Sequence, residues 1–162
     1  MKNKPNIRIE IDPGCTVPEI VIRTDKKTAD IERLIEAIEA ENENDLPKIK
    51  GYNGSIMTLI NQKDLVRAYT EHRKVLICTL SESYEARYTL RELEELLDED
   101  HFVRISRFEI VNLDKVSGFD FSLAGTIKVN FENGDSTWVA RRYVKAIEER
   151  LERLQAGRGA AL

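Results

Sequence analysis

This chain of 162 residues has only two cysteines, no long apolar run and no excess of basic residues. Its two cysteines, Cys15 and Cys78, lie far apart and lack the spacing of metal ligands. No apolar run approaches the roughly 20 residues that cross a bilayer, and the N-terminus lacks the apolar core of a signal peptide. We therefore expect a cytoplasmic protein with reduced thiols, no metal site and no insertion into a membrane.

The sequence motifs of common enzyme classes are missing as well. Gly51 and Gly54 are not followed by the Gly-Lys-Ser/Thr ending of a phosphate-binding loop, and no Gly-x-Ser-x-Gly elbow occurs. The two histidines have no obvious nucleophile partner, which argues against a hydrolase triad. We therefore expect neither an enzyme nor a bound cofactor.

The net charge of −4 argues at first against a nucleic-acid partner. Its distribution weakens that argument, because residues 1–46 hold 7 basic and 11 acidic residues, whereas residues 47–162 hold 18 of each. Residues 101–145 hold 7 basic and 5 acidic residues. Exposed charges more than about 10 Å apart are largely screened from each other. The later part of the chain can therefore carry a local basic face.

The sequence of the first 46 residues predicts a small ββα unit. Residues 6–11 alternate apolar and polar side chains with period two, and residues 19–23 form a second short apolar run, which predicts two strands. Apolar residues then recur at helical spacing and predict a helix over residues 26–41. A polar segment that ends in Pro47 follows, so we place a domain boundary after residue 46.

Residues 47–155 favour a domain of short strands. We predict strands at residues 56–60, 65–69, 74–80, 84–88, 102–105, 110–112, 116–121, 126–131 and 137–139. Thr89 and Glu92 fit a capping box before a leucine-rich helix, Asn133-Gly134 is a type I′ hairpin signal, and a C-terminal helix precedes an expected disordered tail at 156–162. Strands joined by short turns imply antiparallel sheets, and hence a mainly β, α+β fold.

Two clusters of basic residues lie at the ends of predicted strands. In the segment Phe102–Asn112 the arginines have no acidic neighbour except Glu109. The segment Arg141–Lys145 follows the hairpin and holds three basic residues. Cations on rigid β-connections suit a polyanion better than a small molecule. These clusters therefore predict a protein that binds double-stranded DNA.

The order and spacing of these segments resemble the LytTR DNA-binding family of bacterial transcription regulators, over roughly residues 48–152. The matching motifs are Phe-x-Arg-Ile-x-Arg-x-x-Ile-Val-Asn (102–112), Leu113–Val116, the Asn133-Gly134 hairpin and Val139–Lys145. The N-terminal unit resembles the extension of a subfamily without a phosphoacceptor receiver. The resemblance implies antiparallel sheets laid end to end, with loops on one side that enter adjacent major grooves and contact the minor groove between them.

Matching positions imply DNA contacts from three segments. Their DNA-binding residues are His72, Arg73, Arg104, Ser106, Arg107, Arg141, Arg142 and Lys145. We predict base-edge contacts for Arg107 and Arg142, because a guanidinium can bond O6 and N7 of guanine together. Arg104, Arg141 and Lys145 are predicted to contact phosphates. Ser106, Phe108 and Glu109 depart from the residues usual in the family, which leaves the target sequence open.

The predicted function is a sequence-specific transcription regulator that acts as a homodimer, with a regulatory partner such as a membrane protein. The dimer is motivated by the apolar stripe of the helix at residues 31–38, which needs a covering surface. Two alternatives remain open: a protein-interaction module on the same fold, favoured by the net acidity and Glu109, and a small-ligand sensor with a pocket beside the N-terminal unit. For Arg107 and Arg142 the alternative is an ion pair with Glu109 or Asp135.

Overall fold

The computed structural model describes residues 5–160, and at residues 42–44 and 156–160 it describes the backbone alone. The chain divides into two compact units, Met1–Ile38 and Glu39–Leu162. The functional boundary expected after residue 46 remains a prediction. None of the helices in the described residues is long and apolar enough to cross a membrane.

In the first unit, the described residues before helix α1 (Ala29–Asn44) form neither helix nor strand, and most of α1 follows them. The helix was predicted, but the two strands expected at residues 6–11 and 19–23 are not formed, and that prediction is wrong. A strand needs a hydrogen-bonded neighbour and a covered apolar face. Ile7, Ile9 and Ile11 instead remain 84%, 82% and 90% exposed. The period-two pattern is present, but the part of the chain that the structure describes provides no partner strand for it.

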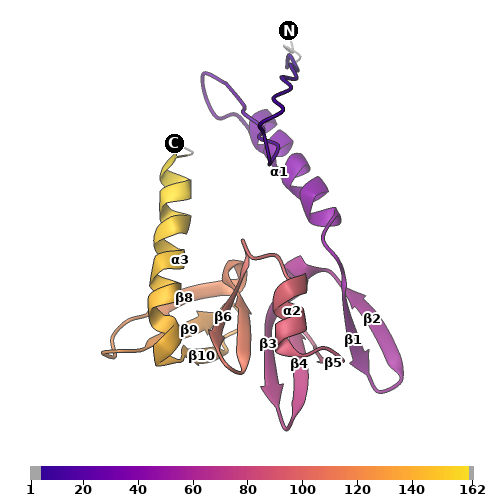
Figure 1. Ribbon diagram of the computed structural model, residues 1–162, viewed down its shortest axis with the longest axis vertical. Coiled ribbons are helices and arrows are strands. Elements are labelled where there is room, and N and C mark those ends of the chain that lie inside the picture. Colours follow the sequence, from indigo (N-terminus) through magenta and orange to yellow (C-terminus); the bar gives the residue numbers. More distant parts are fainter. Residues whose placement is uncertain (1–4, 161–162) are drawn as a thin grey trace. The chain divides into compact units, whose positions relative to one another are not determined.

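The second unit contains two antiparallel sheets (Figure 1). The larger sheet has seven strands in the order β2-β1-β5-β4-β3-β7-β6, and the smaller has the order β10-β9-β8. The strands are β1 (Ile49–Asn53), β2 (Ile56–Ile60), β3 (Leu65–Glu71), β4 (Lys74–Thr79), β5 (Ser83–Ala86), β6 (Phe102–Ser106), β7 (Glu109–Asn112), β8 (Val116–Asp120), β9 (Ile127–Phe131) and β10 (Ser136–Val139). The expected antiparallel α+β fold is confirmed for this unit.

Two 3-10 helices and two α-helices accompany the strands of the second unit. The 3-10 helices η1 (Gln62–Asp64) and η2 (Leu113–Lys115) lead into β3 and β8. Along the chain, helix α2 (Leu90–Leu96) connects β5 to β6, and α3 (Arg141–Ala160) follows β10. The backbone of α3 is helical to Ala160, beyond residue 156 where the sequence predicts a disordered tail to begin.

Strand β1 was not predicted, because Gly51 interrupts a short and mostly polar segment. The glycine is required by close packing between strands. A Cβ atom at this position would lie 2.7 Å from Cδ1 of Ile60 on β2 and 2.8 Å from Cβ of Tyr84 on β5. The residue that weakens the sequence signal for a strand is therefore the one that lets three strands approach each other.

Two apolar cores hold the second unit together. The first core packs α2 against the seven-stranded sheet, through Leu93, Leu65 and Ile77 among others. The second joins β6 and β7 to the smaller sheet and α3, through residues such as Ile105, Val129 and Ile147. Helix α2 begins with the predicted capping box, in which Thr89 Oγ1 accepts from the Glu92 amide at 3.2 Å and Glu92 Oε2 accepts from the Thr89 amide at 2.7 Å.

Two hairpin turns differ from the sequence prediction in an informative way. A type I′ turn requires positive φ at both central residues, but in the β9–β10 turn only Gly134 has one (φ 88°), so the type I′ prediction at Asn133-Gly134 is wrong. The hairpin is longer than two residues, because its first strand pair is Asn130–Ser136. Strands β3 and β4 are instead joined by two residues alone, His72 (φ 49°) and Arg73 (φ 66°).

Candidate nucleic-acid interface

Three segments that carry the predicted DNA-binding residues are linked in a row by backbone hydrogen bonds. The Thr70 amide at the end of β3 donates to the Phe108 carbonyl in the β6–β7 turn at 2.9 Å. The Ala140 amide, just before α3, donates to the Ile105 carbonyl of β6 at 2.9 Å. Figure 1 shows the β3–β4 turn, the β6–β7 turn and the start of α3 along its lower edge. The β6–β7 turn is therefore the middle member of the row.

The β3–β4 turn presents His72 and Arg73 to solvent in a strained backbone conformation. Both side chains are exposed, and both residues have positive φ. Positive φ is uncommon outside glycine. Two-residue hairpin turns in which both residues have positive φ usually contain Asn-Gly. Such strain costs of the order of 1–3 kcal/mol per residue and is found mainly where function requires the side chains.

The β6–β7 turn consists of Arg107 and Phe108, and hydrogen bonds from the Arg104 side chain hold its backbone. The Arg104 guanidinium donates from Nε to the Ser106 carbonyl and from Nη2 to the Arg107 carbonyl, both at 2.7 Å. Its Nη1 contacts Glu94 Oε2 at 3.0 Å, and the side chain is only 19% exposed. Arg104 thus fixes the shape of the turn, whereas the phosphate contact predicted for it remains a prediction.

Phe108 at the tip of this turn is 62% exposed although it is a large apolar residue. Its backbone is held on both sides, because its amide donates to Ser106 Oγ at 3.1 Å and its carbonyl accepts from Thr70. An apolar side chain on a fixed backbone can contact a thymine methyl group or insert between base steps. The sequence identified Phe108 only as a departure from the family pattern.

Helix α3 begins with two exposed arginines, Arg141 and Arg142, and Lys145 is exposed one turn later. Its first turn contains no acidic residue. The positive end of a helix dipole normally attracts acidic side chains or bound anions, and basic residues there are unfavourable without an anion. This end of α3 therefore has the electrostatics of a phosphate site. The Arg142 guanidinium also lies 5.5 Å from the centre of the Tyr143 ring.

Glu109 is buried in an ion pair that the sequence did not reveal. Its Oε1 contacts Arg67 Nη1 at 3.0 Å, and its Oε2 accepts from Thr137 Oγ1 at 2.6 Å. Arg67 also lies 3.8 Å from Asp135 and 4.7 Å from the centre of the Tyr69 ring. Burial, followed by the nearby Cys78, raises the pKa of Tyr69 above its ordinary value. This network joins the two sheets behind the row of turns.

The network removes the alternative expected for Arg107 and Arg142, since both of their candidate acidic partners contact Arg67. In the described part of the chain, six of the predicted residues are exposed and take part in no salt bridge. They are His72, Arg73, Arg107, Arg141, Arg142 and Lys145. The structure thus places free positive charge on three connected segments, and their individual DNA contacts remain predictions.

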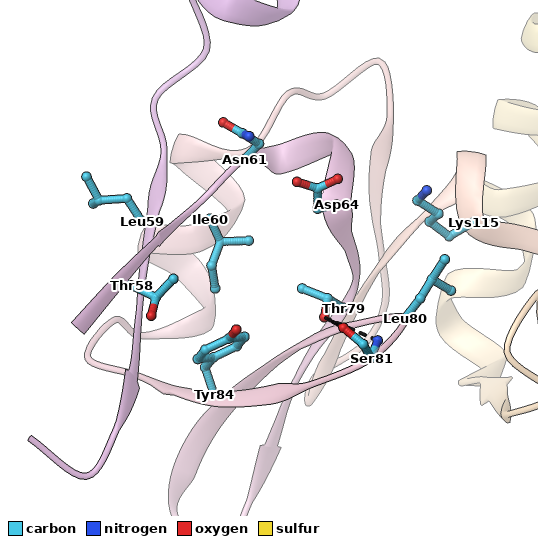
Figure 2. A pocket seen from close by; sticks show the side chains of 10 residues that line it. All are labelled: Thr58, Leu59, Ile60, Asn61, Asp64, Thr79, Leu80, Ser81, Tyr84 and Lys115. Carbon is cyan, nitrogen blue, oxygen red and sulfur yellow. Dashed lines mark hydrogen bonds between the residues drawn. The ribbon is translucent and has the colours of Figure 1, made fainter. Parts of the chain in front are cut away.

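A separate concave region lies elsewhere on the second unit (Figure 2). This cleft of about 340 Å³ is lined mainly by the ends of β2 and β4, with Leu59 on one side and Leu80 and Lys115 on the other. Much of its lining is polar, including Asn61, Asp64 and the hydroxyl groups near Ser81. None of the predicted DNA-binding residues lines it.

Comparisons with known proteins agree with this architecture. The model of the LytTr DNA-binding domain family matches residues 55–152. The chain is similar to an HTH-type transcriptional regulator of Staphylococcus aureus strain NCTC 8325, with 29% identity over 148 residues that cover 90% of this chain and 97% of the relative. A second such regulator, from strain MSSA476, is 30% identical over 135 residues that cover 82% of this chain and 88% of the relative.

A solved structure shows the same fold at low sequence identity. A LytTr DNA-binding domain of a Bacillus cereus response regulator superposes with a TM-score of 0.63 and 19% identity, covering 65% of this chain and 96% of that domain. The family model covers more than half of the chain and spans all three segments of the row. The chain therefore belongs to the LytTr DNA-binding domain family.

Proposed function

We propose that this chain is a transcription regulator that binds double-stranded DNA sequence-specifically through the three linked segments. The observation that carries the proposal is the row itself: two backbone hydrogen bonds hold three segments side by side, and each segment exposes cations that form no salt bridge within the described residues. A duplex presents closely spaced phosphates and base edges along one direction. A rigid row of cations suits such a ligand better than it suits a small molecule.

The alternative of a protein-interaction module loses its main support. That alternative relied on the acidity of the chain and on Glu109 within the basic motif. Glu109 is buried against Arg67 and Thr137, so its charge does not face the surface that the turns present. The names of the Staphylococcus aureus relatives also favour transcription regulation.

The geometry suggests different roles for the individual residues. Arg107 and Arg142 are exposed on rigid supports and suit bidentate contacts with guanine, each worth about 1–3 kcal/mol of discrimination between bases. Arg141 and Lys145 flank the positive end of α3 and suit phosphates. His72 and Arg73 extend the row at its other end, and Ser106 orients the middle turn.

The proposal is tested by selecting bound sequences from random duplexes and then measuring affinities across a salt series. Arg142→Ala should relax the base preference at one position of the selected site. Arg141→Ala should weaken binding to all sequences alike and reduce the slope of log K against log salt by about 0.9. Arg91→Ala, at an exposed α2 site paired with Glu95, is the matched control and should bind like the native chain.

Failure to select any sequence, together with a salt slope near zero, would contradict the proposed function. Equal and sequence-blind losses from Arg142→Ala and Arg141→Ala would leave DNA binding intact but contradict the division of roles.

We also propose that the regulator acts as a homodimer, because α1 has an apolar stripe and the chain before it exposes several large apolar side chains. Light scattering over the micromolar range tests this, and a chain that stays monomeric throughout would contradict it. The regulatory partner, such as a membrane protein, remains a prediction.

A further inference from the structure

The segment Asn6–Ile11 has the sequence of a strand but no neighbour within the described residues. Its three isoleucines, Ile7, Ile9 and Ile11, are all more than four-fifths exposed. Arg8 and Glu10 alternate with them, and their side chains meet at 3.2 Å while remaining 83% and 76% exposed. In a strand, this alternation would place the three isoleucines on one side and one charge of each sign on the other.

The order of these residues is complementary to itself in antiparallel orientation. If two copies pair about a two-fold axis at Ile9, then Ile7 lies opposite Ile11 of the second copy. Arg8 then lies opposite the second copy's Glu10, and Glu10 opposite its Arg8. Opposite charges on directly facing residues stabilise antiparallel pairs, and like charges destabilise them. Each of the five central positions therefore finds a suitable partner in this register.

We propose that Asn6–Ile11 pairs with the same segment of a second copy, forming a two-stranded antiparallel ribbon centred on Ile9. This inference deepens the proposed homodimer and rests on it. Pairing would satisfy the backbone groups of the segment, which the described residues leave without strand partners. It would also explain why a period-two pattern occurs in a part of the chain that forms no sheet on its own.

The same unit supplies a surface that can cover the ribbon. A two-stranded ribbon alone is marginally stable in water and needs a covered apolar face. The apolar stripe of α1 runs from Ile31 to Ile38 and spans about 11 Å, and Ile7 to Ile11 spans about 13 Å in a strand. The two lengths are similar, so the stripe can pack along most of one strand of the ribbon. The interface then consists of the isoleucines of both strands and the α1 stripe of each copy.

The charged residues give a test that is specific to this register. In the full-length chain, Arg8→Glu places four acidic residues at the two facing pairs, and Glu10→Arg places four basic residues there. Each variant alone should self-associate roughly tenfold more weakly than the native chain, measured by analytical ultracentrifugation. An equimolar mixture should recover native-like affinity, because each variant then faces the opposite charge. Native mass spectrometry should show the mixed dimer in excess.

Arg33→Glu is the matched control, since it makes the same change of charge at a 75% exposed position of α1. It should dimerise like the native chain. Native self-association in both single variants, or no recovery in the mixture, would overturn the ribbon while the homodimer stands. A native chain that is monomeric throughout would overturn both. Binding of each variant to a duplex with one site should be unchanged, so a failure of DNA binding is detected separately.

Discussion

At the scale of single residues, Arg104 separates two explanations that a sequence cannot distinguish. A phosphate contact needs only a positive charge, whereas bracing of the β6–β7 turn needs the planar fork that donates to the Ser106 and Arg107 carbonyls. We expect Arg104→Lys to lose DNA affinity nearly as strongly as Arg104→Ala, with little change in the salt slope. Fluorescence anisotropy across a salt series measures both. Near-native affinity of Arg104→Lys would instead favour the phosphate contact.

The buried pair behind the turns should matter for stability more than for recognition. Glu109→Ala leaves the 19% exposed Arg67 without its main partner, and breaking a buried pair in this way costs about 3 kcal/mol. Urea denaturation should show this loss. Asp135→Ala is the control, because Asp135 is 58% exposed and 3.8 Å from Arg67, so its removal should cost below about 1 kcal/mol. Equal losses in the two variants would contradict the importance of Glu109.

Residue roles could be predicted only where the sequence motif is local. The exposed arginines Arg107, Arg141 and Arg142 lie within short matching segments, and the structure finds them exposed as expected. The partner of Glu109 is Arg67, which lies 42 residues earlier in the chain. No periodicity or spacing connects such positions before β3 and β7 are paired.

At the scale of elements, the β3–β4 turn trades stability for exposed side chains. Replacing His72-Arg73 with Asn-Gly should raise the free energy of unfolding by about 1 kcal/mol, because these residues accept positive φ more easily. The same change should lower DNA affinity, because two side chains of the row are lost. Arg73→Lys, which keeps the charge and the strain, should change neither property greatly. A less stable Asn-Gly variant would show that the turn is not strained.

Strand predictions succeeded where an apolar segment and a pairing partner occur together. Strands β2, β3 and β4 have both, whereas residues 6–11 have an apolar pattern but no partner strand within the described residues. Strand β1 has the partners but a weak pattern, because Gly51 gives up a side chain so that Ile60 and Tyr84 can approach. Sequence patterns report which face is apolar, but the neighbour that covers it is decided by the fold.

At the scale of the whole molecule, recognition and assembly should be separable. Both apolar cores and all three segments that carry the predicted DNA-binding residues lie after residue 46. The buried Gln62 donates to the Pro47 carbonyl at 2.9 Å and to the Leu96 carbonyl at 3.0 Å, so residue 47 belongs to the packed domain. We therefore expect a fragment of residues 47–155 to unfold cooperatively in urea.

The same fragment should bind a duplex with one site as tightly as the full chain does. It should lose the extra affinity that the full chain has for a duplex with two sites. Two linked binding units gain on the order of a hundredfold in affinity when both engage together, and residues 1–46 carry the surface that we propose links the two copies. Removing them also removes a net charge of −4, which should strengthen binding to unrelated DNA at low salt. Binding to one-site and two-site duplexes, measured with the fragment and the full chain, checks both expectations. If the fragment retained the full preference for two sites, the contact between copies would have to lie within residues 47–155, and the exposed isoleucines of the first unit would need another explanation.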